Sequence, residues 1–207
     1  MTFDPQRALI PLSLGVFFVL YFYFKVPPWA LSLLMLWIPL YYIGMPILTK
    51  RKWRSFEREF AYRFPLEDYD GLLAFYKRQW FLRQFGPRPE MLEKLGLIYI
   101  AMGKNPEAER ILEQAIQISE RRHREKFLLN LAQVKYELGK YDEAEQIYKR
   151  LLHRSPHLSG AQLRLALIHA HRGVDLERSV SVLKAELVRA KGEDRLRIEE
   201  ALAAASA

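Results

Sequence analysis

Residues 127–156 read FLLNLAQVKYELGKYDEAEQIYKRLLHRSP, and residues 91–116, MLEKLGLIYIAMGKNPEAERILEQAI, repeat their pattern. Apolar residues in both stretches recur three or four positions apart, which is the period of an α-helix, and no alternating strand pattern interrupts them. The equivalent positions, 36 residues apart, are Leu92 and Leu128, Gly96 and Ala132, Ala108 and Ala144, and Leu112 and Tyr148. Self-similarity at such a period predicts stacked pairs of helices that bury their apolar faces only together.

Small residues and glycines mark the joints of this array. Gly103, Gly139 and Gly173 stand where the first helix of each pair should end, so we expect them to adopt positive φ. A third unit, residues 159–190, keeps the pattern of the first helix but lacks the alanine expected in its second helix. Tyr69 and Asp70 precede Tyr141 and Asp142 by 72 residues, or two periods, so residues 67–84 are predicted to form the second helix of a divergent first repeat. The first helix of that repeat is expected over about residues 51–64.

This pattern resembles the tetratricopeptide repeat family over roughly residues 67–190, with Leu92 and Leu112 in place of the family's Trp and Phe. The resemblance implies an all-α fold, an α-solenoid of about three to four helix pairs. We divide the chain into a transmembrane helical hairpin at 1–50, a basic juxtamembrane helix with the divergent repeat at 51–88, repeats at 89–192, and a C-terminal capping helix at 193–207.

Two apolar runs at the N-terminus have the length of membrane spans. Residues 8–24 and residues 29–48 carry no charge, and Pro27 and Pro28 between them end one helix before the next begins. We therefore expect a tight hairpin of two transmembrane helices. A cleaved signal peptide is the alternative for the first run, but no small-residue cleavage site follows it and a second apolar run comes at once.

A basic cluster directly follows the second run, at Lys50, Arg51, Lys52, Arg54 and Arg58. By the positive-inside rule it predicts that both termini are cytoplasmic, in an integral inner (plasma) membrane protein of a bacterium. The same cluster would attract anionic lipid, or it serves as a topology signal alone. Of the net charge of +8, the part beyond residue 48 carries +7; basic residues there alternate with glutamates and no nucleic-acid signature appears, so we do not expect nucleic acid as a partner.

The family resemblance implies a concave groove, lined by the first helix of each pair, that binds a peptide or a helix of another protein. The aliphatic floor and scattered cations suit an amphipathic helix with acidic flanks. The alternatives are that the chain's own C-terminal helix fills the groove, or that a second copy does so in a homo-oligomer. Asn130 and Arg164 fit the carboxylate clamp of some family members, but Glu93, Leu97 and Gly160 stand where its Lys, Asn and Lys belong. The inward positions are Glu93, Lys94, Leu97, Ile100, Lys126, Leu129, Asn130, Gln133, Leu163, Arg164, Leu167 and His171.

The sequence offers no catalytic, cofactor or metal site, so we do not expect an enzyme. Cysteine is absent, which excludes thiolate ligands and thiol nucleophiles. His153 and His157 are separated by Pro156, and His169 and His171, two apart, face different sides of a helix. Trp53 and Trp80 favour interfacial or core roles over ligand stacking.

These features favour a membrane-anchored interaction scaffold whose repeats recruit partner proteins or help assemble them at the inner membrane. The alternative is a structural subunit of a membrane enzyme or transport complex, in which the hairpin is the main contact. Periplasmic repeats, a third possibility, would require the basic cluster to be overridden.

Overall fold

The computed structural model describes residues 15, 16, 18, 19, 21–23, 25, 27–120 and 124–206. The chain divides into two compact units, residues 1–65 and residues 66–207. Most of the first predicted span, residues 8–24, lies outside the described part. Among the described residues, no helix combines the length and apolarity that crossing a bilayer would need.

The first unit is dominated by one helix, α2 (Pro28–Arg63), in which a proline occupies the first helical position. A proline is favoured there because its missing N–H would have no partner inside the helix. The run predicted as the second span and the helix predicted over residues 51–64 are both parts of α2. Its C-terminal half carries a ladder of rings at helical spacing, with centroids 5.5–5.9 Å apart from Trp53 to Phe56, Phe60 and Phe64. The 3-10 turn η1 (Phe64–Leu66) follows.

The second unit begins with two short helices, α3 (Tyr69–Arg78) and α4 (Trp80–Phe85), where the sequence predicted one helix over residues 67–84. The break falls at Gln79, whose ψ of 50° is not helical. Both helices pack on α5 through buried side chains, Leu72 and Tyr76 from α3 and Leu82 from α4. In an uninterrupted helix Leu82 would point about 120° away from Tyr76. The break turns both side chains toward the core.

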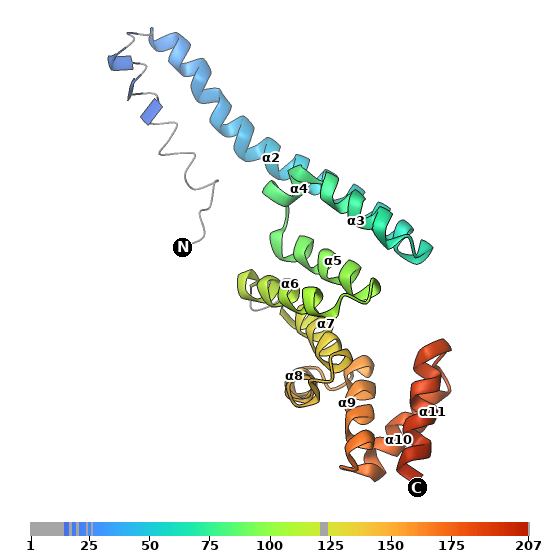
Figure 1. Ribbon diagram of the computed structural model, residues 1–207. Coiled ribbons are helices and arrows are strands. Elements are labelled where there is room, and N and C mark those ends of the chain that lie inside the picture. The colour runs from blue at the N-terminus through green and yellow to red at the C-terminus, as the bar shows by residue number, and fades with distance from the viewer. Residues whose placement is uncertain are drawn as a thin grey trace. The chain divides into compact units, whose positions relative to one another are not determined.

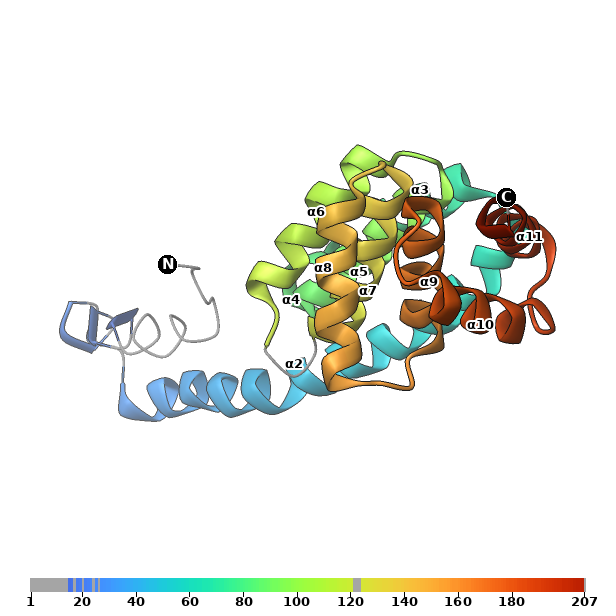
Figure 2. The same cartoon turned by 90° about the horizontal axis from the view of Figure 1, so that it is seen from below.

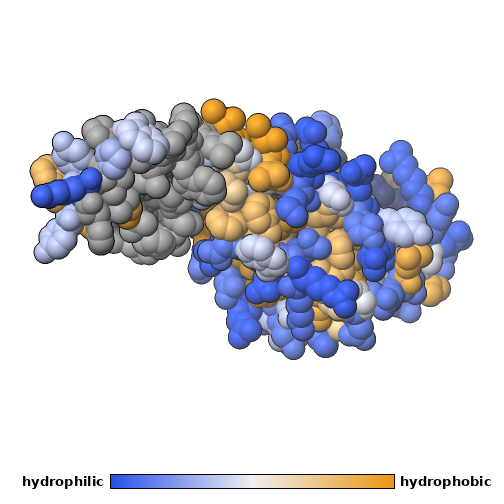
Figure 3. All heavy atoms as spheres, turned by 90° about the horizontal axis from the view of Figure 1, so that it is seen from above, coloured by the Kyte–Doolittle hydropathy of each residue, from blue (hydrophilic) through white to orange (hydrophobic). Residues whose placement is uncertain are grey.

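The rest of the unit is the predicted helical solenoid, in which each helix packs on the next (Figures 1 and 2). Hydrophilic side chains cover much of the array on the face in Figure 3, as expected for helices that bury one side only. The helices are α5 (Arg88–Ala101), α6 (Asn105–Ile118), α7 (Arg124–Glu137), α8 (Tyr141–Arg154), α9 (Ser159–Arg172), α10 (Leu176–Leu187) and α11 (Gly192–Ser206).

Close helix contacts explain the small residues of the repeat. Ala108, Ala132 and Ala144 are fully buried. A Cβ atom at Gly96 would stand 2.9 Å from the side chain of Leu112, which is closer than carbon atoms normally approach. Gly103, Gly139 and Gly173 have φ of 67–72°, as the sequence predicted for the joints. Small side chains therefore set the distance between α5 and α6 and between α7 and α8.

In the pair α9–α10, a longer turn compensates for the alanine that is missing from the second helix. After Gly173 the chain takes a second residue of positive φ, Asp175, and α10 starts one residue later than α6 and α8 do after their glycines. This shift places Ser179, rather than Arg178, at the fourth position of the helix, where α6 and α8 have their buried alanines. Ser179 is 2% exposed, and its hydroxyl donates to the backbone oxygen of Asp175 at 2.8 Å.

Candidate partner-binding groove

The predicted inward positions of α5 and α7 form a mixed apolar and basic surface. Lys94, Leu97 and Ile100 of α5 are half-buried, as are Leu129, Asn130 and Gln133 of α7, whereas Lys126 is exposed. Ile100 and Leu129 also pack against buried core clusters, while Leu97 belongs to none of the three clusters found among the described residues. Leu97, Ile100 and Leu129 thus provide the aliphatic part of this surface.

Glu93 occupies the position at which the family's clamp has a lysine, and it links α5 to α7. Its side chain is 9% exposed and accepts from Lys126 Nζ at 2.9 Å and from Asn130 Nδ2 at 3.4 Å. The Glu93 carboxylate thus accepts a hydrogen bond from the Asn130 amide, which would otherwise donate to the carboxylate of a bound peptide. This geometry disfavours capture of a peptide C-terminus by Asn130.

The last helix, α11, covers the C-terminal end of the predicted groove. It packs on α9 as well as on α10, and Leu163 and Leu167 of α9 lie in one cluster with Ile198 of α11. Arg164 Nη2 pairs with Asp194 Oδ1 at 3.2 Å, and its guanidinium lies 5.5 Å from the ring centre of Tyr136. Three of the predicted groove residues, Leu163, Arg164 and Leu167, therefore contact the chain's own C-terminal helix.

An ion pair between α11 and α7 lies at the same end of the predicted groove. Arg197 Nη1 of α11 lies 2.6 Å from Glu137 Oε1, and Nη2 lies 3.3 Å from the other carboxylate oxygen. A hollow of about 260 Å³ remains beside it, with His171 at its edge, 5.7 Å from the Tyr141 ring. The hollow is lined by Tyr136, Tyr141, Leu167, His171, Arg197, Glu200, Ala201 and Ala204.

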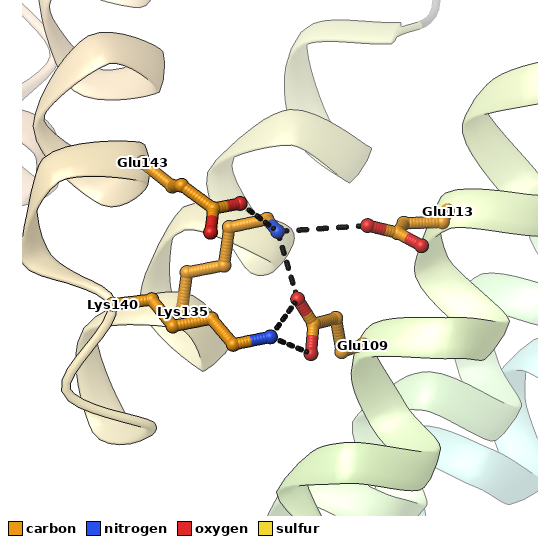
Figure 4. A network of polar contacts seen from close by, with 5 residues as sticks. All are labelled: Glu109, Glu113, Lys135, Lys140 and Glu143. Carbon is orange, nitrogen blue, oxygen red and sulfur yellow. Dashed lines mark hydrogen bonds and ion pairs between the residues drawn. The ribbon is translucent and has the colours of Figure 1, made fainter.

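A network of charges around the buried Lys135 and Glu109 joins the pair α5–α6 to the pair α7–α8 (Figure 4). Lys135 of α7, 7% exposed at its side chain, lies 2.7 Å from Glu109 and 2.6 Å from Glu143. Lys140 also reaches Glu109, at 2.8 Å, and Glu113 lies 3.5 Å from Lys135. Burial raises the pKa of Glu109, but the hydrogen bonds from Lys135 and Lys140 outweigh it, so the pKa lies below its usual value.

The pKa of Lys135 shifts in the opposite direction to that of Glu109. Burial lowers its pKa, but hydrogen bonds to Glu109 and Glu143 outweigh this and raise the pKa above that of a free lysine. The ammonium group is therefore charged at any pH at which the protein functions. This network could not be predicted from the sequence, because the partners of Lys135 are 26 and 8 residues away from it.

A second hollow, of about 470 Å³, lies between α8, α9 and the turn before α10, where the sequence predicted no site. At its edge, Glu145 Oε1 lies 2.6 Å from Lys149 Nζ and 3.3 Å from His169 Nε2. The hydrogen bond from Lys149 is the main reason that the pKa of Glu145 lies below its usual value. Lys149 and His169 therefore both have a partner within the fold.

The remaining predicted sites are placed as follows. Lys50, Arg51, Lys52, Arg54 and Arg58, the residues predicted to face lipid, are all exposed on α2. His153 and His157 are exposed on and beyond α8. Within the described part of the chain, no three His, Cys, Asp or Glu side chains lie close enough to hold a metal ion.

Comparison with known proteins supports the repeat assignment. Residues 88–154 match the family model described as Tetratricopeptide repeat. Among solved structures, a Podosopora anserina putative kinesin light chain with nearly identical TPR-like repeats shares 17% identity at a TM-score of 0.55, covering 74% of this chain and 85% of that one. PcrH from Pseudomonas aeruginosa shares 21% identity at a TM-score of 0.45, covering 57% and 92%. No curated protein sequence matches significantly. The family match and the kinesin light chain structure support a tetratricopeptide-like helical solenoid.

Proposed function

We propose that the chain is a membrane-anchored interaction scaffold that binds an extended peptide or an amphipathic helix of another protein on the inner surface of α5 and α7. The observation that carries this proposal is the contrast between the two ends of the predicted groove. On α9, Leu163, Arg164 and Leu167 are engaged by α11, whereas on α5 and α7 Leu97 and Gln133 remain partly exposed.

The chemistry of the surface narrows the partner. Lys94 and Lys126 flank the aliphatic Leu97, and Lys126 is exposed although it pairs with Glu93. An incoming helix would place apolar side chains, three or four residues apart, on Leu97 and Leu129 and acidic residues beside the two lysines. Recruitment of such a partner is the kind of function that helical repeat arrays perform with their extended faces.

Cross-linking from single positions tests this surface. A photoreactive residue at Leu97 or Gln133 should yield discrete partner adducts in cells, and the same residue at exposed Gln114 of α6 or Gln146 of α8 should not. Leu97→Glu should abolish the adducts formed from position 133, and Gln146→Glu should leave them unchanged, with helicity equal in both variants. Adducts only from positions 114 and 146 would move the binding surface to the second helices of the pairs.

Membrane anchoring is a separate part of the proposal and rests on the two uncharged runs and the exposed basic cluster of α2. A reporter fused after Ala207 that is active only in the cytoplasm would support the proposed orientation. If the protein did not co-sediment with membranes after alkaline extraction, anchoring would be refuted.

The alternative, a subunit whose hairpin packs against other spans, is tested by exchange. Replacing residues 1–48 with an unrelated two-span anchor should preserve recruitment by the repeats. Loss of recruitment in a chimera that still inserts would favour the subunit function.

A further inference from the structure

The segment before the first complete helix pair has a composition found nowhere else in the array. Residues 75–88, FYKRQWFLRQFGPR, contain four cations, five aromatic residues and no acidic residue. The cations Lys77, Arg78, Arg83 and Arg88 are all exposed. This concentration of one sign of charge calls for an anionic partner.

Among the described residues, none of the four cations has an acidic partner, whereas several cations of the later repeats do. Lys126, Lys135 and Lys140 each pair with a glutamate, as do Arg172 and Arg197. By contrast, within the described part of the chain Lys77, Arg78, Arg83 and Arg88 form no ion pair, and the hydrogen bond from Arg83 to the Lys77 backbone, at 3.4 Å, is long. The charge of this segment is therefore not neutralised within the fold.

A tryptophan, Trp80, follows the helix break at Gln79, and in sequence it lies between Arg78 and Arg83. Turning Leu82 into the core leaves Trp80, two positions earlier, 69% exposed at the start of α4. Its ring touches Phe81 edge-on with centroids 5.9 Å apart, and Phe81 in turn lies 5.3 Å from Phe85. An indole with an apolar body and a polar N–H, flanked in sequence by cations, has the chemistry of side chains found at lipid headgroups.

We propose that residues 75–88 dock on a bilayer surface that contains anionic phospholipid, with Trp80 at headgroup depth and the four cations beside phosphate groups. This inference rests on the proposed membrane anchoring, which would hold the array close to such a surface, and it adds a second contact beyond the cluster on α2. Single-stranded nucleic acid is less suited to the segment, because stacking requires several open aromatic faces and Phe81 and Phe85 are half-buried against each other.

Trp80 fluorescence in the full chain provides the test. The chain has four tryptophans, so Trp29→Phe, Trp37→Phe and Trp53→Phe together leave Trp80 as the reporter. The protein is reconstituted into phosphatidylcholine vesicles with or without phosphatidylglycerol, each carrying lipid brominated near the headgroup. We expect Trp80 emission to shift to shorter wavelength and to be quenched when phosphatidylglycerol is present, and high salt to reverse both changes.

Matched charge variants then identify the cations. Lys77→Gln, Arg78→Gln and Arg83→Gln combined should abolish the phosphatidylglycerol-dependent quenching, since each cation near an anionic surface contributes about a fivefold change in binding. Lys104→Gln, Arg110→Gln and Arg189→Gln remove the same charge from exposed positions elsewhere and should retain it. Equal helicity of the two triple variants establishes that both are folded.

The other outcomes separate this inference from the anchoring on which it rests. A chain that does not float with either kind of vesicle would refute anchoring and docking together. A chain that floats while Trp80 emission ignores phosphatidylglycerol would refute docking alone. Quenching by polyuridylate without vesicles, combined with no response to lipid, would assign the segment to nucleic acid and overturn the proposal.

Discussion

Lys135 Nζ lies 2.7 Å from Glu109 Oε1, so a nearly buried ammonium group ties α7 to the second helix of the preceding pair. Lys140 approaches the other oxygen of the same carboxylate at 2.8 Å. Stacked repeats are stabilised by contacts between neighbours. This pair is a polar contact of that kind at the junction of the two helix pairs.

Lys135→Met should destabilise the protein by about 2 kcal/mol. Removing one partner of a buried pair leaves the other charge without compensation, which costs about 3–5 kcal/mol in general. Here the cost is smaller because Lys140 still reaches Glu109. Chemical denaturation measures the change. Lys149→Met removes an exposed lysine whose partner Glu145 keeps Arg172, so it should change stability by less than about 0.5 kcal/mol. Equal losses in the two variants would show that burial is unimportant here.

Acid should weaken the array through Glu109. Its pKa is lower in the folded state than in the unfolded chain, so its contribution is complete above the unfolded value and is lost as pH falls through the folded pKa. We expect the stability advantage of the parent over Glu109→Gln to shrink as pH falls from about 5 toward 3. Denaturation midpoints across that interval measure it. A constant advantage would contradict the lowered pKa.

Gly96→Val should destabilise the protein by about 2 kcal/mol, because the added carbon atoms meet the fully buried Leu112 and force the first pair of helices apart. Gly160→Ala is the matched control. A Cβ there meets nothing within 4 Å, so the change should leave stability equal or raise it by up to about 1 kcal/mol. Thermal unfolding of the two variants distinguishes a packing requirement from general sensitivity to changes at glycine.

Arg197→Ala should loosen α11 without affecting α5 to α8. The pair with Glu137 is about three-quarters buried on both sides, so we expect a loss of about 1 kcal/mol. That loss corresponds to roughly fivefold faster amide hydrogen exchange in α11. Mass spectrometry resolves the helices. Arg195→Ala, which removes a pair within α11 at exposed positions, should have a smaller effect. Unchanged exchange in both would show that the pair with Glu137 does not hold the helix in place.

The repeat core could be predicted from the sequence because a few side chains decide it. Ala108 and Ala144 are buried where two helices approach, and Gly103 and Gly139 have the positive φ that their position after a helix predicted. Such positions tolerate few residue types, so their spacing reports the fold directly. The breaks in the pattern were harder to interpret, since Ser179 takes the alanine's place only through a turn one residue longer.

The details of the groove could not be predicted in the same way. The position of Glu93 was assigned from the pattern, but its contacts with Lys126 and Asn130 depend on rotamers of side chains 33 and 37 residues away. The packing of α11 depends on contacts of Ile198, Asp194 and Arg197 with residues of α9 and α7 that are distant in sequence. Local periodicity carries no information about such pairings.

The burial of Ile198 against α9 and α10 also constrains how the array can evolve. Arrays of this type change size when a unit is duplicated next to an existing one, and the newcomer must find an open apolar face on which to stack. Here α11 already occupies that face at the C-terminal end. Growth is therefore open to insertions between existing units, whereas a unit stacked directly on α9 and α10 would first have to displace α11.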